Sequence, residues 1–263
     1  MAFGPRPAGS PAAERARQYI AAELKRASAE VRVQSFEADT PHGRLRMANV
    51  TGVLKGRRPD VIMIGGHYDT KFFRDFVFVG ANDGGSSTAL LLELARVLGA
   101  RPREYTYWLA FFDGEEARER WSATDSLYGS RRMAAELQRT KNLPRAMILV
   151  DMIGDRHLGI LREGVSTPWL TDLVWTAARR LGHQSHFLAE TQLVEDDHVP
   201  FLRAGVPATL LIDFDYPPWH TAGDTLDKVS ADSLRVVGEV LLDALPSIEE
   251  TLTREGGADA PRH

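Results

Sequence analysis

The sequence predicts a single α/β domain, in which a mostly parallel mixed sheet is covered by helices on both faces. Short apolar segments typical of buried strands alternate with segments of helical period. The chain has 263 residues, of which 43% are hydrophobic and 26% charged, as expected of one globular domain with a substantial core. We expect residues 1–254 to form this domain and residues 255–263 (EGGADAPRH) to be a disordered tail.

The N-terminal part of the chain predicts a helix and then two strands. Ser10 followed by Pro11 matches the N-cap and first position of a helix. Strands are expected over 31–38 and 46–54, with a turn at 41–43 between them. These two strands would add an antiparallel edge to the sheet.

Beyond residue 60, strands and helices alternate. Strands are expected over 61–65, 105–112, 146–150 and 208–212, and helices over 87–98, 127–137 and 168–181. Apolar residues from 234 to 248 mark a closing helix, which we expect Pro246 to bend or end.

Composition limits the function more than it defines it. The chain contains no cysteine, so a metal would need His, Asp or Glu ligands. A net charge of −4 gives no reason to expect nucleic acid as a partner. No apolar run approaches the roughly 20 residues that span a membrane, and no signal peptide is visible.

Acidic and imidazole side chains follow nearly every expected central strand. In open α/β sheets, ligands collect at the carboxyl ends of the strands, so these side chains can converge. Each one alone has a plainer explanation as a helix cap, a loop histidine or a solvated helix start. Their accumulation favours a functional site. The residues are His67, Asp69, Asp83, Asp113, Glu115, Glu116, Asp151 and His220.

The adjacent glutamates at 115 and 116 suit metal chemistry. Successive residues in a loop point in different directions, so one carboxylate can bind a metal while the other faces a substrate. A zinc site with oxygen and nitrogen ligands keeps a position open for a substrate oxygen. A second carboxylate beside it can then move protons.

These motifs resemble those of the zinc aminopeptidases that bind two metal ions, and more closely those of their relatives, the glutaminyl-peptide cyclotransferases of animal type. The strings GHYDT, ANDGGSS, DGEE and HTAGDTLDKVS are similar to both groups. The strings RPAGSP, HYDTKFF, FFDGEEARERWSATDSLYGSR and EDDHVPFLRAGVP are similar to the cyclotransferases in particular. The resemblance extends from about residue 6 to residue 227 and implies the zinc aminopeptidase-like fold.

The resemblance implies a role for each matching residue. Asp83, Glu116 and His220 would bind one zinc ion, and Glu115 would be the general acid/base. Asp151 and Asp197 would form a hydrogen-bonded acidic pair that raises the pKa of Glu115. Trp219 and Trp121 would contact the substrate, although either could be a core aromatic. In the peptidases, the positions of His67 and Asp151 complete a second metal site.

The implied activity is cyclisation of an N-terminal glutamine to pyroglutamate, with release of ammonia. The substrate would be a peptide or protein that begins with Gln, and the enzyme a monomer, periplasmic or secreted as its relatives commonly are. A dinuclear zinc aminopeptidase and a binding module without catalysis are the alternatives. The compact stretch between Asp155 and Glu195 and the string HTAGDTLDKVS at 220–230 resemble the peptidases. The cysteines of the secreted animal enzymes are absent.

Overall fold

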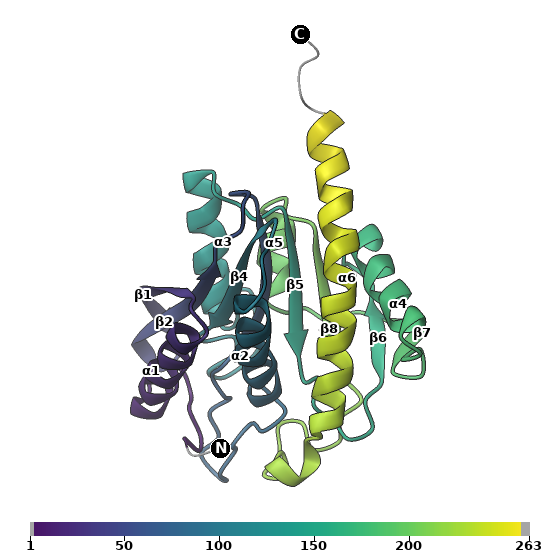
Figure 1. Ribbon diagram of the computed structural model, residues 1–263. Coiled ribbons are helices and arrows are strands. Elements are labelled where there is room, and N and C mark those ends of the chain that lie inside the picture. The colour runs from purple at the N-terminus through teal and green to yellow at the C-terminus, as the bar shows by residue number, and fades with distance from the viewer. Residues whose placement is uncertain (1–2, 259–263) are drawn as a thin grey trace.

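A six-stranded sheet forms the centre of the structure, a computed structural model that describes residues 3–258 (Figure 1). Its strand order is β1-β2-β4-β3-β5-β8, in which the last four strands run parallel and β1 and β2 form an antiparallel edge. This mixed sheet confirms the predicted fold class. The strands are β1 (Glu30–Thr40), β2 (Gly43–Leu54), β3 (Val61–His67), β4 (Thr106–Phe112), β5 (Ala146–Asp151) and β8 (Ala208–Ile212).

Helices cover both faces of this sheet. The core on one face includes α1 (Pro11–Arg26), α2 (Gly85–Gly99), α4 (Pro168–Arg180) and α6 (Ala231–Ala258). The core on the other includes α3 (Tyr128–Thr140) and α5 (His198–Arg203). Beside the main sheet lies a parallel pair, β6 (Ile160–Glu163) and β7 (Phe187–Gln192), and a short 3₁₀ helix, η1 (Leu226–Lys228), precedes α6.

Local sequence signals locate most of these elements. The Ser10 hydroxyl accepts a hydrogen bond of 3.1 Å from the backbone N–H of Ala13, as the predicted N-cap requires. β6, β7 and α5 are not among the predicted elements. These elements have only four to six residues, and β7 has a single buried residue, so they lack a clear hydrophobic period.

The closing helix is longer than its sequence suggests. α6 continues through Pro246 to Ala258, so of the two effects expected of this proline, bending or ending the helix, the second does not occur. Proline removes one backbone hydrogen bond, but Ile248 and Leu252 beyond it are buried against the core and keep the helix going. The first four residues of the predicted tail, 255–258, are therefore helical, and residues 259–263 lie outside the described part.

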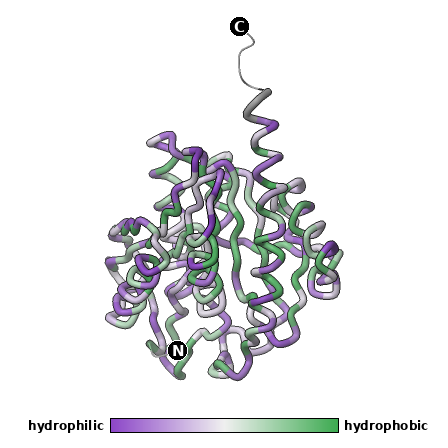
Figure 2. Tube along the Cα trace, viewed as in Figure 1, coloured by the Kyte–Doolittle hydropathy of each residue, from purple (hydrophilic) through white to green (hydrophobic). Residues whose placement is uncertain are grey.

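The hydrophobic core follows the central strands, whose trace is mostly apolar in Figure 2. Every residue of β5 and β8 is buried, as expected for parallel strands covered on both faces. Within residues 3–258, the helices include none with the length and apolar character needed to cross a lipid bilayer.

We expect Leu91→Ala to lower the free energy of unfolding by about 2–5 kcal/mol, because Leu91 is completely buried in α2 and its truncation leaves a cavity. Leu226→Ala is the matched control, since Leu226 is 64% exposed and its loss should change stability by less than about 0.5 kcal/mol. Urea unfolding measures both variants. Equal shifts of the two midpoints would contradict this assignment of the core.

Candidate metal centre and active site

Loops that follow the parallel strands meet at one edge of the sheet. β3 ends at His67 and β5 ends at Asp151. Glu115 and Glu116 come just after β4, and His220 lies in the loop after β8. Because parallel strands share the direction of their carboxyl ends, residues far apart in sequence become neighbours here.

Asp83, Glu116 and His220 form one candidate metal-binding group. The His220 Nε2 atom lies 3.1 Å from Glu116 Oε1 and 3.3 Å from Asp83 Oδ2. Ligand atoms of a tetrahedral zinc site with bonds of about 2 Å are about 3.3 Å apart, so this spacing fits zinc. The three predicted ligands therefore lie together in the structure.

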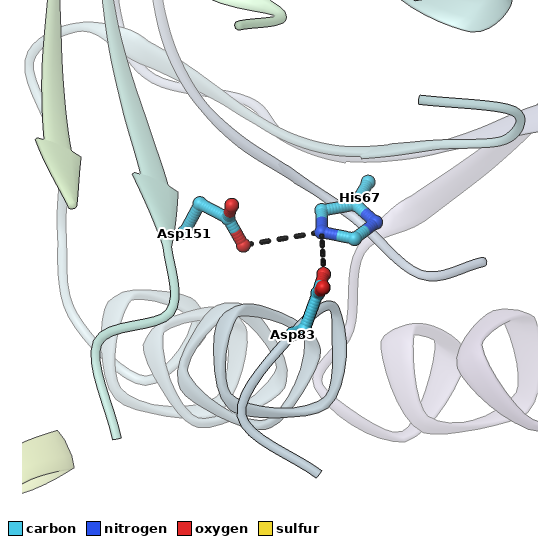
Figure 3. Close-up of side chains that lie close together, drawn as sticks. All are labelled: His67, Asp83 and Asp151. Atoms are coloured by element: carbon cyan, nitrogen blue, oxygen red, sulfur yellow. Dashed lines mark hydrogen bonds and ion pairs between the residues drawn. The ribbon is translucent and has the colours of Figure 1, made fainter. Parts of the chain in front are cut away.

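A second group shares Asp83 with the first (Figure 3). The His67 Nε2 atom lies 3.1 Å from Asp151 Oδ1 and 3.2 Å from Asp83 Oδ1. The other ring nitrogen of His67, Nδ1, lies 3.5 Å from Asp69 Oδ1. Asp83 therefore directs one carboxylate oxygen towards His67 and the other towards His220.

The position of Asp83 is fixed by its own loop and by Asp224. The Asp224 carboxylate accepts hydrogen bonds from the backbone N–H groups of Asn82, at 2.8 Å, and Asp83, at 3.1 Å. The next residue, Gly84, has a φ of +76°, and a Cβ there would lie 2.7 Å from the backbone oxygen of Asp69. Asp224 is not among the predicted site residues. Its place in the string HTAGDT, four residues after His220, was the sequence feature that could have indicated its role.

The charges of the first group favour a bound cation. Burial raises the pKa of Asp83, but hydrogen bonds with His220 and His67 lower it more, so this carboxyl group is ionised. Burial lowers the pKa of His220, but hydrogen bonds with Asp83 and Glu116 raise it to about 9. Apart from His220 Nε2 at 3.3 Å, the buried Asp83 Oδ2 atom has no polar partner among the described residues. Imidazole and carboxylate donors arranged in this way suit zinc.

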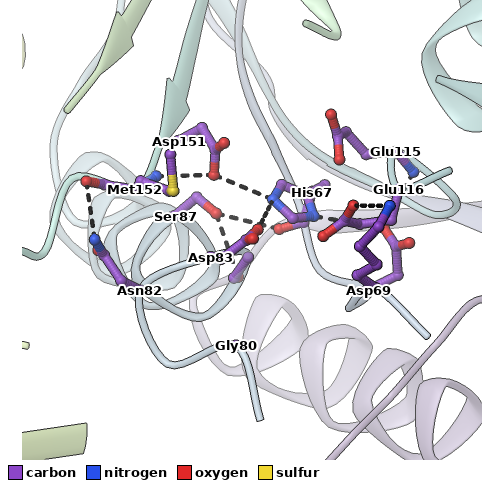
Figure 4. A network of polar contacts seen from close by, with 12 residues as sticks. His67, Asp69, Gly80, Asn82, Asp83, Ser87, Glu115, Glu116, Asp151 and Met152 are labelled. Atoms are coloured by element: carbon purple, nitrogen blue, oxygen red, sulfur yellow. Dashed lines mark hydrogen bonds and ion pairs between the residues drawn. The ribbon is translucent and has the colours of Figure 1, made fainter. Parts of the chain in front are cut away.

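Glu115 lies beside both groups, within the polar network around His67 (Figure 4). Its backbone N–H donates a hydrogen bond of 3.2 Å to Asp69 Oδ1. Burial raises the pKa of the Glu115 carboxyl group well above its ordinary value. The charge of Glu116 raises this pKa further, while that of His67 opposes the increase. A carboxyl group with a raised pKa can both accept and donate a proton near neutral pH.

Asp197, the predicted acidic partner of Asp151, differs from its neighbour Asp196 in what it faces. Asp196 lines the same cavity as Asp151 and Glu115, and Asp197 does not. Burial and the charge of Asp151 raise the pKa of Asp196. Asp197 is completely buried at the start of α5, with a pKa raised by burial to about 7, and no hydrogen bond joins it to Asp151 within residues 3–258. Sequence alone does not show which of two consecutive side chains faces the cavity.

A cavity of about 570 Å³ opens onto these side chains. Both predicted substrate-contacting tryptophans line it, at 37% exposure for Trp121 and 38% for Trp219. The Trp219 ring stacks on the His220 ring with centroids 4.1 Å apart, and Trp121 Nε1 donates a hydrogen bond of 3.1 Å to Glu195. The cavity wall thus combines acidic groups with aromatic rings.

The chain is similar in sequence to proteins of known family. Residues 49–245 match peptidase family M28. The chain is 32% identical to the glutaminyl-peptide cyclotransferase of Bos taurus, over 89% of this chain and 76% of the relative.

The chain is also similar to proteins whose structures have been solved. A glutaminyl cyclase from an Acidobacteriales bacterium is 43% identical, with a TM-score of 0.92 over 95% of this chain and 90% of the other. A Zn-dependent exopeptidase from Parabacteroides distasonis is 25% identical, with a TM-score of 0.87 over 92% of each chain. The chain belongs to peptidase family M28 and, within it, to the glutaminyl-peptide cyclotransferases.

Proposed function

We propose that this chain converts the N-terminal glutamine of peptides or proteins to pyroglutamate, with zinc as its cofactor. The observation that carries this proposal is the position of Glu115. This protonatable carboxyl group opens onto the same cavity as the ligand group of Asp83, Glu116 and His220. The names of the similar cyclotransferases support the reaction, and the name of the Parabacteroides exopeptidase supports the metal.

Asp83, Glu116 and His220 would hold the zinc ion. Zinc bound there would polarise a substrate carbonyl oxygen and stabilise negative charge on it. The remaining chemistry falls to the protein and to the substrate itself.

Glu115 would transfer the proton. The α-amino nitrogen of the substrate attacks the γ-carbonyl carbon of the same glutamine, a new C–N bond forms, and the bond to the side-chain nitrogen breaks. Glu115 takes a proton from the attacking amine and delivers one to the leaving nitrogen, which departs as ammonia. Because both reacting groups belong to one residue, a cavity that holds the side chain folded supplies rate by proximity. Trp219 and Trp121 are placed to form its walls.

Asp151 and Asp196 would keep Glu115 able to carry a proton. Both carboxylates line the cavity with Glu115, and the charge of Asp196 raises the pKa of Glu115 after the larger effect of burial. The proposed acidic pair beside the acid/base is therefore Asp151 and Asp196.

One zinc ion per chain is the stoichiometry that we propose. All three residues of the first group line the cavity, whereas His67 of the second group does not. His67 is 1% exposed, and its ring nitrogens face Asp83, Asp151 and Asp69. It therefore serves as a hydrogen-bonding partner of these carboxylates. A dinuclear aminopeptidase is the second candidate, because Asp83 faces both groups with separate oxygens.

Incubation with a peptide that begins with Gln is expected to release ammonia and leave a blocked amino terminus. Glu115→Gln should lower kcat by about 10²–10⁴-fold, because it removes the group that transfers the proton. Glu119→Gln, at the exposed rim of the same cavity, is the control and should retain activity. Release of free amino acids in place of ammonia would refute the cyclase and support the aminopeptidase.

Elemental analysis should find one zinc ion per chain after dialysis against buffer that contains zinc. His220→Ala should lose this zinc, since it removes one of three protein ligands, and His67→Ala should keep it. Two zinc ions per chain in the unaltered protein, with one lost in His67→Ala, would favour the dinuclear alternative.

Asp224→Ala is expected to weaken zinc binding about 10–100-fold, since it removes the hydrogen bonds that fix the backbone of Asn82 and Asp83. Chelator competition measures this change in Kd. Asp227→Ala is the matched control, because that carboxylate is exposed and, among residues 3–258, bonds only Thr225 and Lys228. Equal zinc affinity in the two variants would show that Asp224 does not position the ligand.

A further inference from the structure

The segment 71–80 (KFFRDFVFVG) connects the loop after β3 to the loop that carries Asp83, and we name it the ligand strap. Four of its ten residues are phenylalanine. Phe73 stacks on Phe76 with ring centroids 4.4 Å apart, and its ring meets that of Phe78 edge-on at 5.5 Å. The strap is therefore built around an aromatic cluster beside the proposed metal centre.

The strap contacts two of the proposed ligands and leads directly to the third. At its start, Lys71 Nζ donates hydrogen bonds of 3.5 Å to Glu116 Oε2 and 3.1 Å to the backbone oxygen of Ala117. In its middle, the rings of Phe73 and Phe78 each lie 5.8 Å from the His220 ring, at interplanar angles of 70° and 90°. At its end, it continues into the loop of Asp83.

Aromatic contacts enclose the His220 ring. A metal-bound histidine usually donates its second ring N–H to a protein acceptor, which fixes the ring plane. Within residues 3–258, the contacts of the His220 side chain with acceptor atoms all involve Nε2, which faces Asp83 and Glu116. Trp219 stacks on one side of the ring, and Phe73 and Phe78 meet it edge-on. Edge-on aromatic pairs at this separation are favourable.

The backbone does not hold His220 in a relaxed conformation. Its φ is +54°, in the left-handed region that non-glycine residues rarely occupy. The long loop between β8 and α6 that carries it contains only the short helix η1. Packing from outside this loop is therefore needed to select one direction for the imidazole.

Arg6 anchors the far end of the strap. Its buried guanidinium donates hydrogen bonds to the backbone oxygens of Tyr68, Val79 and Gly80, at 2.6, 2.6 and 3.0 Å. These bonds join the start of the loop after β3 to the end of the strap. With Lys71 bonded at the other end, both ends of the aromatic cluster are fixed.

We propose that the ligand strap positions His220 for metal binding, with Phe73 and Phe78 as positioning residues that set the plane of its ring. This inference rests on the proposed zinc centre but not on the proposed reaction. Loss of the Phe73 ring would let the imidazole rotate, so ligand geometry and affinity would change while the fold persists.

Phe73→Ala tests this proposal, and Phe76→Ala is its matched control. Both residues are half-buried phenylalanines of the strap, but only Phe73 contacts His220. We expect Phe73→Ala to weaken zinc binding about tenfold in chelator competition, Phe76→Ala to weaken it less, and Phe73→Tyr to restore it. The visible spectrum of the cobalt-substituted protein should change in Phe73→Ala only, because it reports ligand geometry. Thermal unfolding of each metal-free variant measures any loss of folding separately.

The outcomes separate this inference from the proposed function. If Phe73→Ala and Phe76→Ala bind zinc equally and their cobalt spectra match the unaltered protein, the strap does not position His220. If the unaltered protein binds no zinc, both proposals fail. If it binds zinc and the Phe73 variants behave as expected while no ammonia forms from Gln peptides, the reaction fails and the strap stands.

Discussion

Buried carboxylates that need a cation dominate this structure. Asp83, Glu116 and Asp151 lie within a few ångströms of two imidazoles, out of contact with most solvent. Charges of one sign do not remain together at low exposure unless positive charge or hydrogen-bond donors compensate them. The histidines, the backbone N–H groups and the proposed zinc ion meet this requirement. The shape of the loops around the site follows from it.

The sheet makes this concentration of charge possible. Parallel strands end at one edge, and the rigid core behind them holds each loop at a fixed origin. The Asp224 carboxylate accepts hydrogen bonds from the backbone of the loop that carries Asp83, and the Arg6 guanidinium donates hydrogen bonds to the backbone of the ligand strap, so both segments are fixed. A site built from loops thereby gains the rigidity that a metal centre requires.

Asp83 lies between two groups of possible metal ligands. Its two oxygens face two groups, which is the arrangement a dinuclear peptidase would use. In this chain, the group of Asp83, Glu116 and His220 opens onto the aromatic cavity, and His67 stays behind it. Among the residues of both groups, His67 is the one that does not line this cavity.

The amino-acid sequence by itself determined the class of the fold, the ligand types and most elements. Hydrophobic period marks α2, an unbroken apolar run marks β5, and the absence of cysteine restricts the metal ligands. Motif resemblance indicated Asp83, Glu116 and His220 as candidate zinc ligands and Glu115 as the candidate acid/base, because those residues lie in strings of several matching positions.

Only the tertiary structure decided which residues face the cavity and what supports them. Asp196 and Asp197 are consecutive, and their directions depend on how α5 packs against the sheet. The helix persists through Pro246 because Ile248 and Leu252, which follow it, are buried against core residues that are distant in sequence. The roles of Asp224 and Arg6 depend on contacts across more than 60 positions of the chain. Such contacts cannot be predicted from the local sequence, since they form only when the sheet brings the loops together.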